Sequence, residues 1–160
     1  MIDEEVKAVV SAIIIVALVF AVSQMFLAER IVEPFSEIGL LGPKKKIGDY
    51  PREVIVGEPI KLYLYLGNHE GKVMYYVILV KLGNRSTFVN STIPADAPVI
   101  DVYERILAHN ETCLIPVILR INRTGINLRL IFEMWIYDEN LELKYHGRWL
   151  QLWINVTKPR

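Results

Sequence analysis

Five asparagines of this chain occur in the pattern Asn-x-Ser/Thr, the acceptor sequence for N-linked glycans. They are Asn84, Asn90, Asn110, Asn122 and Asn155. The chain has eight asparagines and ten serines and threonines in 160 residues, so chance predicts about half of one such sequence. Because glycans are added on the exported side of a membrane, the five sequences predict both glycosylation and export. The alternative is that they are ordinary turn asparagines.

The residues that could carry acid–base or metal chemistry form no recognisable motif. The three histidines, His69, His109 and His146, lie far apart and lack the spacing of metal-ligand pairs. Asn68-His69-Glu70 is best interpreted as a solvated turn, with a metal or catalytic pair as the alternative. The sequence has no nucleophile elbow, phosphate-binding loop or dinucleotide fingerprint. We therefore expect no catalytic residues, no metal and no cofactor, and a protein that is not an enzyme.

The charge balance bears on the possible partners, and the cysteine content bears on disulfides and thiol reactivity. The 18 basic and 18 acidic residues give a net charge of +0, so we expect no nucleic acid as a partner. Lys44-Lys45-Lys46 could touch anionic headgroups or a charged envelope polymer, but the solvated face of a linker is the simpler interpretation. Cys113 lies in an apolar run that predicts a buried, unreactive thiol. A single cysteine excludes a disulfide within the chain.

An uncharged segment of 21 residues runs from Ala8 to Ala28. As a helix it would be about 31 Å long, which matches the hydrocarbon core of a bilayer at about 30 Å. We predict an N-terminal transmembrane anchor within residues 1–28 that contacts the lipid bilayer through residues 8–28. A cleaved signal peptide is the alternative, but the apolar stretch is long and the residues before it are acidic rather than basic.

The direction of insertion is contested within the sequence. Arg30 and the triple lysine follow the helix, and by the positive-inside rule they would place the large domain in the cytoplasm. All five glycan acceptor sequences also follow the helix, and long domains translocate largely regardless of charge. We therefore predict a single-pass protein of the cell membrane whose C-terminal domain is extracytoplasmic. An exported domain with one cysteine and two glutamines in the whole chain favours a thermophilic archaeal source.

The rest of the chain has the pattern of β-strands. Residues 29–51 are rich in Pro and Gly and are predicted to be a juxtamembrane linker. From residue 60 onward, aliphatic residues alternate with polar or aromatic ones in short runs separated by turn residues. About seven to nine such strands predict an all-β domain over residues 52–160. The expected fold is an immunoglobulin-like antiparallel β-sandwich preceded by one N-terminal transmembrane helix.

The last predicted strand suggests a surface that contacts a partner. Its residues alternate, so that Leu150, Leu152, Ile154 and Val156 share one face and Trp149, Gln151, Trp153 and Asn155 share the other. If Asn155 carries a glycan, Trp149 and Trp153 must be exposed, and exposed tryptophans are typical contact residues. Tyr63 and Tyr65 could extend the same kind of surface. The alternative is that the linker or a neighbouring loop covers the tryptophan rings.

Five segments together resemble a known family. They are Leu40-Leu41-Gly42-Pro43, Gly48-Asp49-Tyr50-Pro51, Val56-Gly57-Glu58-Pro59, Gly67-Asn68-His69-Glu70-Gly71 and Leu152-Trp153-Ile154-Asn155-Val156-Thr157. Over residues 35–157 the chain is similar to the archaeal membrane-protein family of domain of unknown function 1616. The resemblance implies a membrane-attached, extracytoplasmic β domain without assigned activity, and it transfers no catalytic residues. Many members have a multi-helix membrane region before this domain, whereas this chain has one apolar segment.

Three classes of function fit these observations. We expect a non-enzymatic, membrane-anchored, N-glycosylated cell-envelope protein that acts as a surface scaffold or interaction module. Its partners would be other envelope proteins or further copies of the chain. One alternative is a pilin-like subunit of an extracellular filament, although the acidic start lacks the basic processing signal that pilins use. The other is an accessory subunit of a membrane glycan-processing complex.

Overall fold

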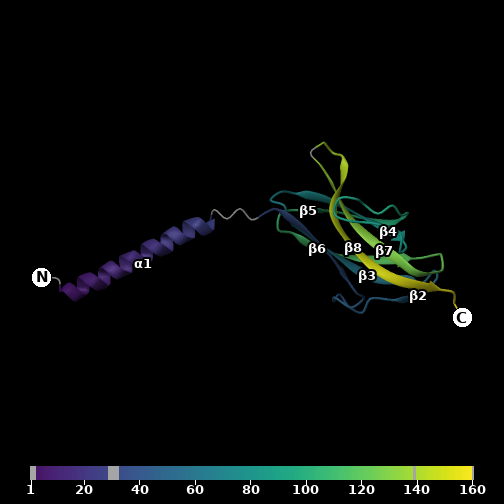
Figure 1. Ribbon diagram of the computed structural model, residues 1–160, viewed down its shortest axis with the longest axis horizontal. Coiled ribbons are helices and arrows are strands. Elements are labelled where there is room, and N and C mark those ends of the chain that lie inside the picture. Colours follow the sequence, from purple (N-terminus) through teal and green to yellow (C-terminus); the bar gives the residue numbers. More distant parts are fainter. Residues whose placement is uncertain (1–2, 29–32, 139, 160) are drawn as a thin grey trace. The chain divides into compact units, whose positions relative to one another are not determined.

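The computed structural model describes residues 3–28, 33–138 and 140–159. The chain divides into two units, Met1–Glu33 and Pro34–Arg160, and each is described by itself (Figure 1). The first unit contains one helix and the second contains all the strands. The predicted all-β, immunoglobulin-like sandwich preceded by one apolar N-terminal helix is confirmed.

Helix α1 (Glu4–Ala28) contains neither Gly nor Pro, and its first turn carries Glu4 and Glu5, where carboxylates complement the helix dipole. Apolar side chains surround the helix, and residues 3–26 are all exposed. The Ser23 hydroxyl donates a hydrogen bond to the Val19 carbonyl (2.7 Å), which satisfies it within the helix. The span Glu4–Phe26 has 23 residues, and its most apolar stretch of 18 residues has a mean hydropathy of 2.6. It is therefore long and apolar enough to cross a membrane, a property that signal sequences share.

The second unit is a sandwich of two sheets. The smaller sheet has the order β1-β3-β6, formed by β1 (Phe35–Leu41), β3 (Pro59–His69) and β6 (Thr112–Arg120). The larger has the order β2-β8-β7-β4-β5, formed by β2 (Glu53–Ile55), β8 (Leu143–Thr157), β7 (Gly125–Tyr137), β4 (Met74–Gly83) and β5 (Val99–Leu107). All pairs are antiparallel except β2 with β8, which run in parallel.

The core lies between the two sheets and follows the period-two alternation of the strands. The inward residues include Ile60, Leu62, Leu64 and Leu66 of β3; Tyr76, Ile78 and Val80 of β4; Ile115, Val117 and Leu119 of β6; Leu130, Phe132 and Met134 of β7; and Leu152, Ile154 and Val156 of β8. Each such side chain stabilises the fold by about 1.5–3 kcal/mol when fully buried. Cys113 packs at the edge of this core, and burial raises the pKa of its thiol, as expected of an unreactive cysteine.

The predicted linker over residues 29–51 is wrong in its second half. Residues 35–41 form β1, which pairs with β3 from Phe35 opposite His69 to Leu41 opposite Tyr63. The strand was missed because Gly39 interrupts it and because Pro34 and Gly42 flank it like turn residues. The sandwich therefore begins near Pro34 rather than at residue 52.

A loop covers part of the outer face of the larger sheet. This covering loop, residues 84–98, joins β4 to β5 and places Val89 and Ala95 on the outward side chains Ile131 and Trp149. The contact forms a second, smaller apolar cluster on the side of the sheet that faces away from the main core. The middle of the outward face of β7 is thus buried rather than solvated.

Candidate functional site

Two of the predicted glycosylation sites lie in the covering loop, in closely similar turns. The Asn84 Oδ1 atom accepts hydrogen bonds from the Ser86 backbone N–H (2.9 Å) and from the Ser86 hydroxyl (2.6 Å). The Asn90 Oδ1 atom accepts the equivalent bonds from Thr92, at 2.8 Å and 3.0 Å. In both turns the carboxamide oxygen is held and the Nδ2 atom, where a glycan attaches, makes no hydrogen bond within the described part of the chain.

Two further acceptor asparagines follow strands β5 and β6. Asn110 is exposed in the turn between them, with a φ of 63°, a left-handed conformation that asparagine tolerates. Its Oδ1 atom lies 3.0 Å from the His69 Nδ1 atom. Asn122 is exposed two residues after β6. Both side chains project from connections between strands, which is where bulky surface glycans are accommodated.

Asn155 differs because it lies inside strand β8. Its Nδ2 atom donates to Glu53 Oε1 (2.7 Å), and its Oδ1 atom accepts from the Asn127 backbone N–H (2.8 Å). The side chain is half-buried, and its neighbour Val156 pairs with β2. A glycan at Asn155 would break the bond to Glu53 and crowd the junction of β2 and β8. The folded geometry therefore disfavours a glycan at Asn155, whereas the other four acceptor asparagines remain predicted glycosylation sites.

The predicted contact tryptophans lie on the outer face of the larger sheet, where they hold a buried arginine. The Arg129 guanidinium lies 5.3 Å from the Trp149 ring centroid and 5.4 Å from the Trp153 ring centroid. It also donates to the Gln151 side chain and to the Thr87 carbonyl of the covering loop. Burial lowers the pKa of Arg129, whose side chain the two rings shield from water.

The covering loop decides how much of this surface is free. Trp149 packs against Val89 and Ala95 and is half-buried, so the alternative interpretation, a loop over the ring, holds for Trp149. Trp153 keeps 39% of its surface exposed. The proposed contact function is therefore possible for Trp153 and is largely replaced by a packing role for Trp149.

A buried ion pair holds the same loop in place, and no sequence motif predicted it. The Lys81 Nζ atom lies 2.8 Å from Glu133 Oε2 and donates to the Ala95 carbonyl (2.8 Å). Glu133 is fully buried and accepts from the Ala95 backbone N–H and from the Trp135 indole N–H (3.1 Å). In the strand pattern, Lys81 and Glu133 occupy ordinary outward positions. Only a loop folded over the sheet makes these positions buried.

The predicted contact tyrosines lie on the opposite side of the sandwich. Tyr63 and Tyr65 project from β3 on the outer face of the smaller sheet, away from the inward leucines of that strand. The Tyr65 hydroxyl donates to Glu37 Oε2 (2.9 Å), and this carboxylate raises the pKa of Tyr65. The Lys45 ammonium lies 5.2 Å from the Tyr63 ring centroid. The tyrosines and tryptophans thus form two separate surfaces.

The three histidines are far apart in the sequence but lie near the end of β3. His109 and His146 contact the turn that follows β3, and His69 contacts the neighbouring strand β1. His69 lies 3.7 Å from Glu37, His146 lies 3.6 Å from Glu70, and the Gly71 N–H donates to the His109 ring. Within residues 3–28, 33–138 and 140–159, no group of three or more His, Cys, Asp or Glu side chains is arranged to hold a metal ion.

Fully buried Asn68 braces this turn. Its Nδ2 atom donates to the Leu107 carbonyl (2.8 Å), and its Oδ1 atom accepts from the Glu70 N–H (2.9 Å). Of the segment singled out in the sequence, Asn68 therefore has a structural role.

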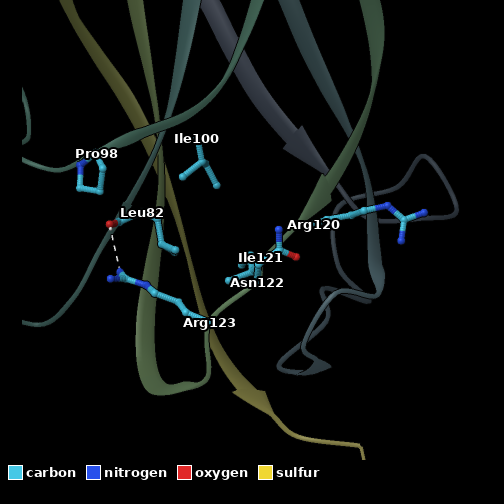
Figure 2. Close-up of a pocket in the computed structure, with 7 residues that line it drawn as sticks. All are labelled: Leu82, Pro98, Ile100, Arg120, Ile121, Asn122 and Arg123. Atoms are coloured by element: carbon cyan, nitrogen blue, oxygen red, sulfur yellow. Dashed lines mark hydrogen bonds between the residues drawn. The ribbon is translucent and has the colours of Figure 1, made fainter.

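A cleft of about 430 Å³ lies near the start of β5. Its lining residues are Leu82, Pro98, Ile100, Arg120, Ile121, Asn122 and Arg123 (Figure 2). The Arg123 guanidinium reaches back to the Leu82 carbonyl (3.4 Å), whereas the Arg120 guanidinium points away from Leu82 and donates to the Gly57 carbonyl (2.8 Å). The lining includes no carboxylate, histidine, thiol or hydroxyl, so it offers no acid–base pair or nucleophile.

Comparisons with known proteins give a family and many distant structural likenesses. The CARDB domain of a Pyrococcus furiosus protein, solved in complex with di-metal ions, is 12% identical with a TM-score of 0.48, covering 79% of this chain and 90% of that one. A β-glucosidase from Listeria innocua in complex with glucose is 12% identical with a TM-score of 0.45, covering 77% of this chain and 16% of the enzyme. A search of curated protein sequences gave no significant match. The family model described as "Domain of unknown function (DUF1616)" matches residues 30–155, and the chain therefore belongs to the DUF1616 family.

Proposed function

We propose that this protein is a non-enzymatic, membrane-anchored module of the cell surface, and that N-linked glycans on its β-sandwich shape which of its faces other envelope proteins can reach. The observation that carries the proposal is the placement of the acceptor asparagines. Asn84, Asn90, Asn110 and Asn122 all lie in connections between strands, where a glycan projects without breaking a strand pair.

The proposal of a membrane anchor is based on the side chains that α1 exposes. A helix of a water-soluble domain buries an apolar stripe, whereas the described residues of α1 expose apolar side chains on every side. Such a helix is stable in a lipid bilayer, which solvates apolar side chains while the helix satisfies its own backbone. The mass of the mature chain distinguishes a cleaved signal sequence from a retained anchor, because cleavage removes the N-terminal segment.

The proposed role as an interaction module is supported by the structural roles of the charged and polar side chains that could otherwise take part in catalysis. Lys81 and Glu133 hold the covering loop, Asn68 braces a turn, and the cleft in Figure 2 has no catalytic side chain among its lining residues. Exposed aromatic and aliphatic side chains remain on both outer faces, among them Trp153 and Ile118. Such side chains supply contact area at protein interfaces.

The test is the intact mass of protein made in its native host. We expect a mass above the 18.4 kDa of the bare chain. Asn84→Gln and Asn90→Gln should each remove the mass of one glycan, because both turns leave Nδ2 free.

Asn155→Gln should leave the mass of the attached glycans unchanged, because Asn155 is engaged by Glu53 and Asn127. Asn127→Gln is the matched control, since Asn127 lies outside any acceptor sequence. Native protein at the bare chain mass would contradict the proposal.

A further inference from the structure

Strand β5 is a free edge of the larger sheet. It pairs with β4 on one side and is the last strand in the order β2-β8-β7-β4-β5 (Figure 1). Four of its apolar side chains are exposed, namely Val99, Ile100, Val102 and Ile106, and Ile106 keeps 65% of its surface in water. An exposed apolar edge strand is a template for pairing with another strand. The strand contains no proline and no glycan acceptor asparagine.

Two backbone positions of β5 show which groups face the free edge. The Val102 N–H donates to the carboxylate of its neighbour Asp101 (2.9 Å). The Glu104 carbonyl accepts from the guanidinium of its neighbour Arg105 (2.7 Å). Because backbone groups of alternate residues point to the same side of a strand, Val102 and Glu104 direct their N–H and C=O groups to the edge. In the described part of the chain, side chains rather than a strand bond to these groups.

We propose that β5 pairs with β5 of a second copy of this chain, antiparallel and in a register centred on Tyr103. In this register Val102 faces Glu104 of the second copy, so their free backbone groups form a hydrogen-bonded pair. Asp101 faces Arg105 of the second copy, an opposite-charge pair that the two-fold axis generates twice.

Charge complementarity selects this register over its neighbours. When residue i faces residue j of the second copy, the sum of i and j can change only in steps of two, because any other change would pair side chains from opposite faces of the sheet. The neighbouring registers are therefore centred on Glu104 and on Val102. A register centred on Glu104 would place the two Glu104 carboxylates opposite each other. A register centred on Val102 would place Asp101 opposite Tyr103 and leave its carboxylate without a cation. The register centred on Tyr103 alone places Asp101 opposite Arg105.

Asp101 and Arg105 have a physical role both in the single chain and in the pair. In the single chain, Asp101 and Arg105 bond to the edge groups of β5 and keep the strand soluble. In the pair they release these groups to the second copy and bind each other. Because the exchange replaces existing bonds and joins one strand from each copy, the association is weak and reversible. It joins the two larger sheets into one continuous sheet.

The inference rests on the proposed function as an interaction module and names its partner as a second copy. It is tested on the pairing alone, so a negative result would leave the glycosylation and anchoring tests unaffected.

The first test is a charge exchange in the full chain in detergent micelles, measured by sedimentation equilibrium. Asp101→Arg and Arg105→Asp should each raise the dimer dissociation constant by about tenfold or more, because each turns two attractive pairs into repulsive ones. The double variant Asp101→Arg/Arg105→Asp should restore the wild-type value. Lys61→Glu, an exposed change on β3 of the other sheet, is the matched control and should have no effect.

The second test is a cysteine scan that reads the register directly. Tyr103→Cys should give a disulfide-linked dimer, because the two positions face each other across the axis at about 4.5 Å between Cα atoms. Val102→Cys and Glu104→Cys should not, since their Cα atoms would lie about 8 Å from their counterparts. The wild type, whose one cysteine is Cys113, gives the background. A wild type that stays monomeric, a double variant as weak as the single ones, or cross-linking at position 102 or 104 but not 103 would each overturn the proposal.

Discussion

Replacing Lys81 by Met isolates the ion pair beneath the covering loop. The change keeps the length of the side chain but leaves the Glu133 carboxylate, fully buried and 2.8 Å from Lys81 Nζ, without its cation. Removing one partner of a buried pair costs about 3–5 kcal/mol, far more than removing an exposed one. For a domain of this size, that loss should lower the melting temperature by about 10–20 °C.

The assay is thermal unfolding of the full chain followed by near-ultraviolet circular dichroism, which also reports on Trp135 and Trp149 beside the pair. Lys81→Met/Glu133→Gln should recover at least half of the lost stability, because the double variant leaves no unpaired charge. Lys61→Met, on an exposed lysine, should change stability by less than about 0.5 kcal/mol. If Lys81→Met costs no more than Lys61→Met, the covering loop does not bury this pair and the account of the outer face is wrong.

Two further substitutions test the loop and the histidine cluster. Gly147→Ala should lower stability by about 2 kcal/mol or more, because φ is 84° and a Cβ atom would lie 2.4 Å from the Ser91 carbonyl oxygen, whereas Gly71→Ala, with φ 75° and open space, should cost about 1 kcal/mol. Equal melting temperatures of the two variants would contradict the contact with Ser91. Burial lowers the pKa of His146 against the opposing effect of Glu70, so the unfolded state takes up this proton first as the pH falls below about 6.5. Urea unfolding should therefore show a steeper loss of stability between about pH 6.5 and pH 5 for the wild type than for His146→Gln, and equal slopes would refute the assignment.

The elements with regular alternation could be predicted from the sequence. In β3, Ile60, Leu62, Leu64 and Leu66 alternate with residues that tolerate water, and this period identifies both the strand and its buried face. The apolar helix was equally clear because its composition is uniform. Strand β1 escaped prediction because its stability comes from pairing with β3 over its whole length, a long-range contact that its own residues do not encode.

The candidate site was predictable only where chemistry is local. The turns of Asn84 and Asn90 are set by the hydroxyl two residues on, so the acceptor pattern itself predicts them. The burial of Lys81 and Glu133 depends on a loop that returns over the sheet, and no local pattern in β4 or β7 distinguishes a covered outward position from a solvated one. The meeting of His69 with Glu37 likewise depends on the pairing of β1 with β3.

The most direct measurement of the central claim, an anchored domain on the outside of the cell, is thiol labelling of intact native-host cells with a membrane-impermeant maleimide. It compares Lys44→Cys, at a side chain that is 77% exposed in the loop after β1, with Asp3→Cys, exposed just before α1. Both variants carry Cys113→Ala, so that each chain has one thiol. The account predicts that the Lys44→Cys variant is labelled in intact cells, and that the Asp3→Cys variant is labelled only after the membrane is permeabilised. Labelling of the Asp3→Cys variant in intact cells, with the Lys44→Cys variant protected, would contradict it.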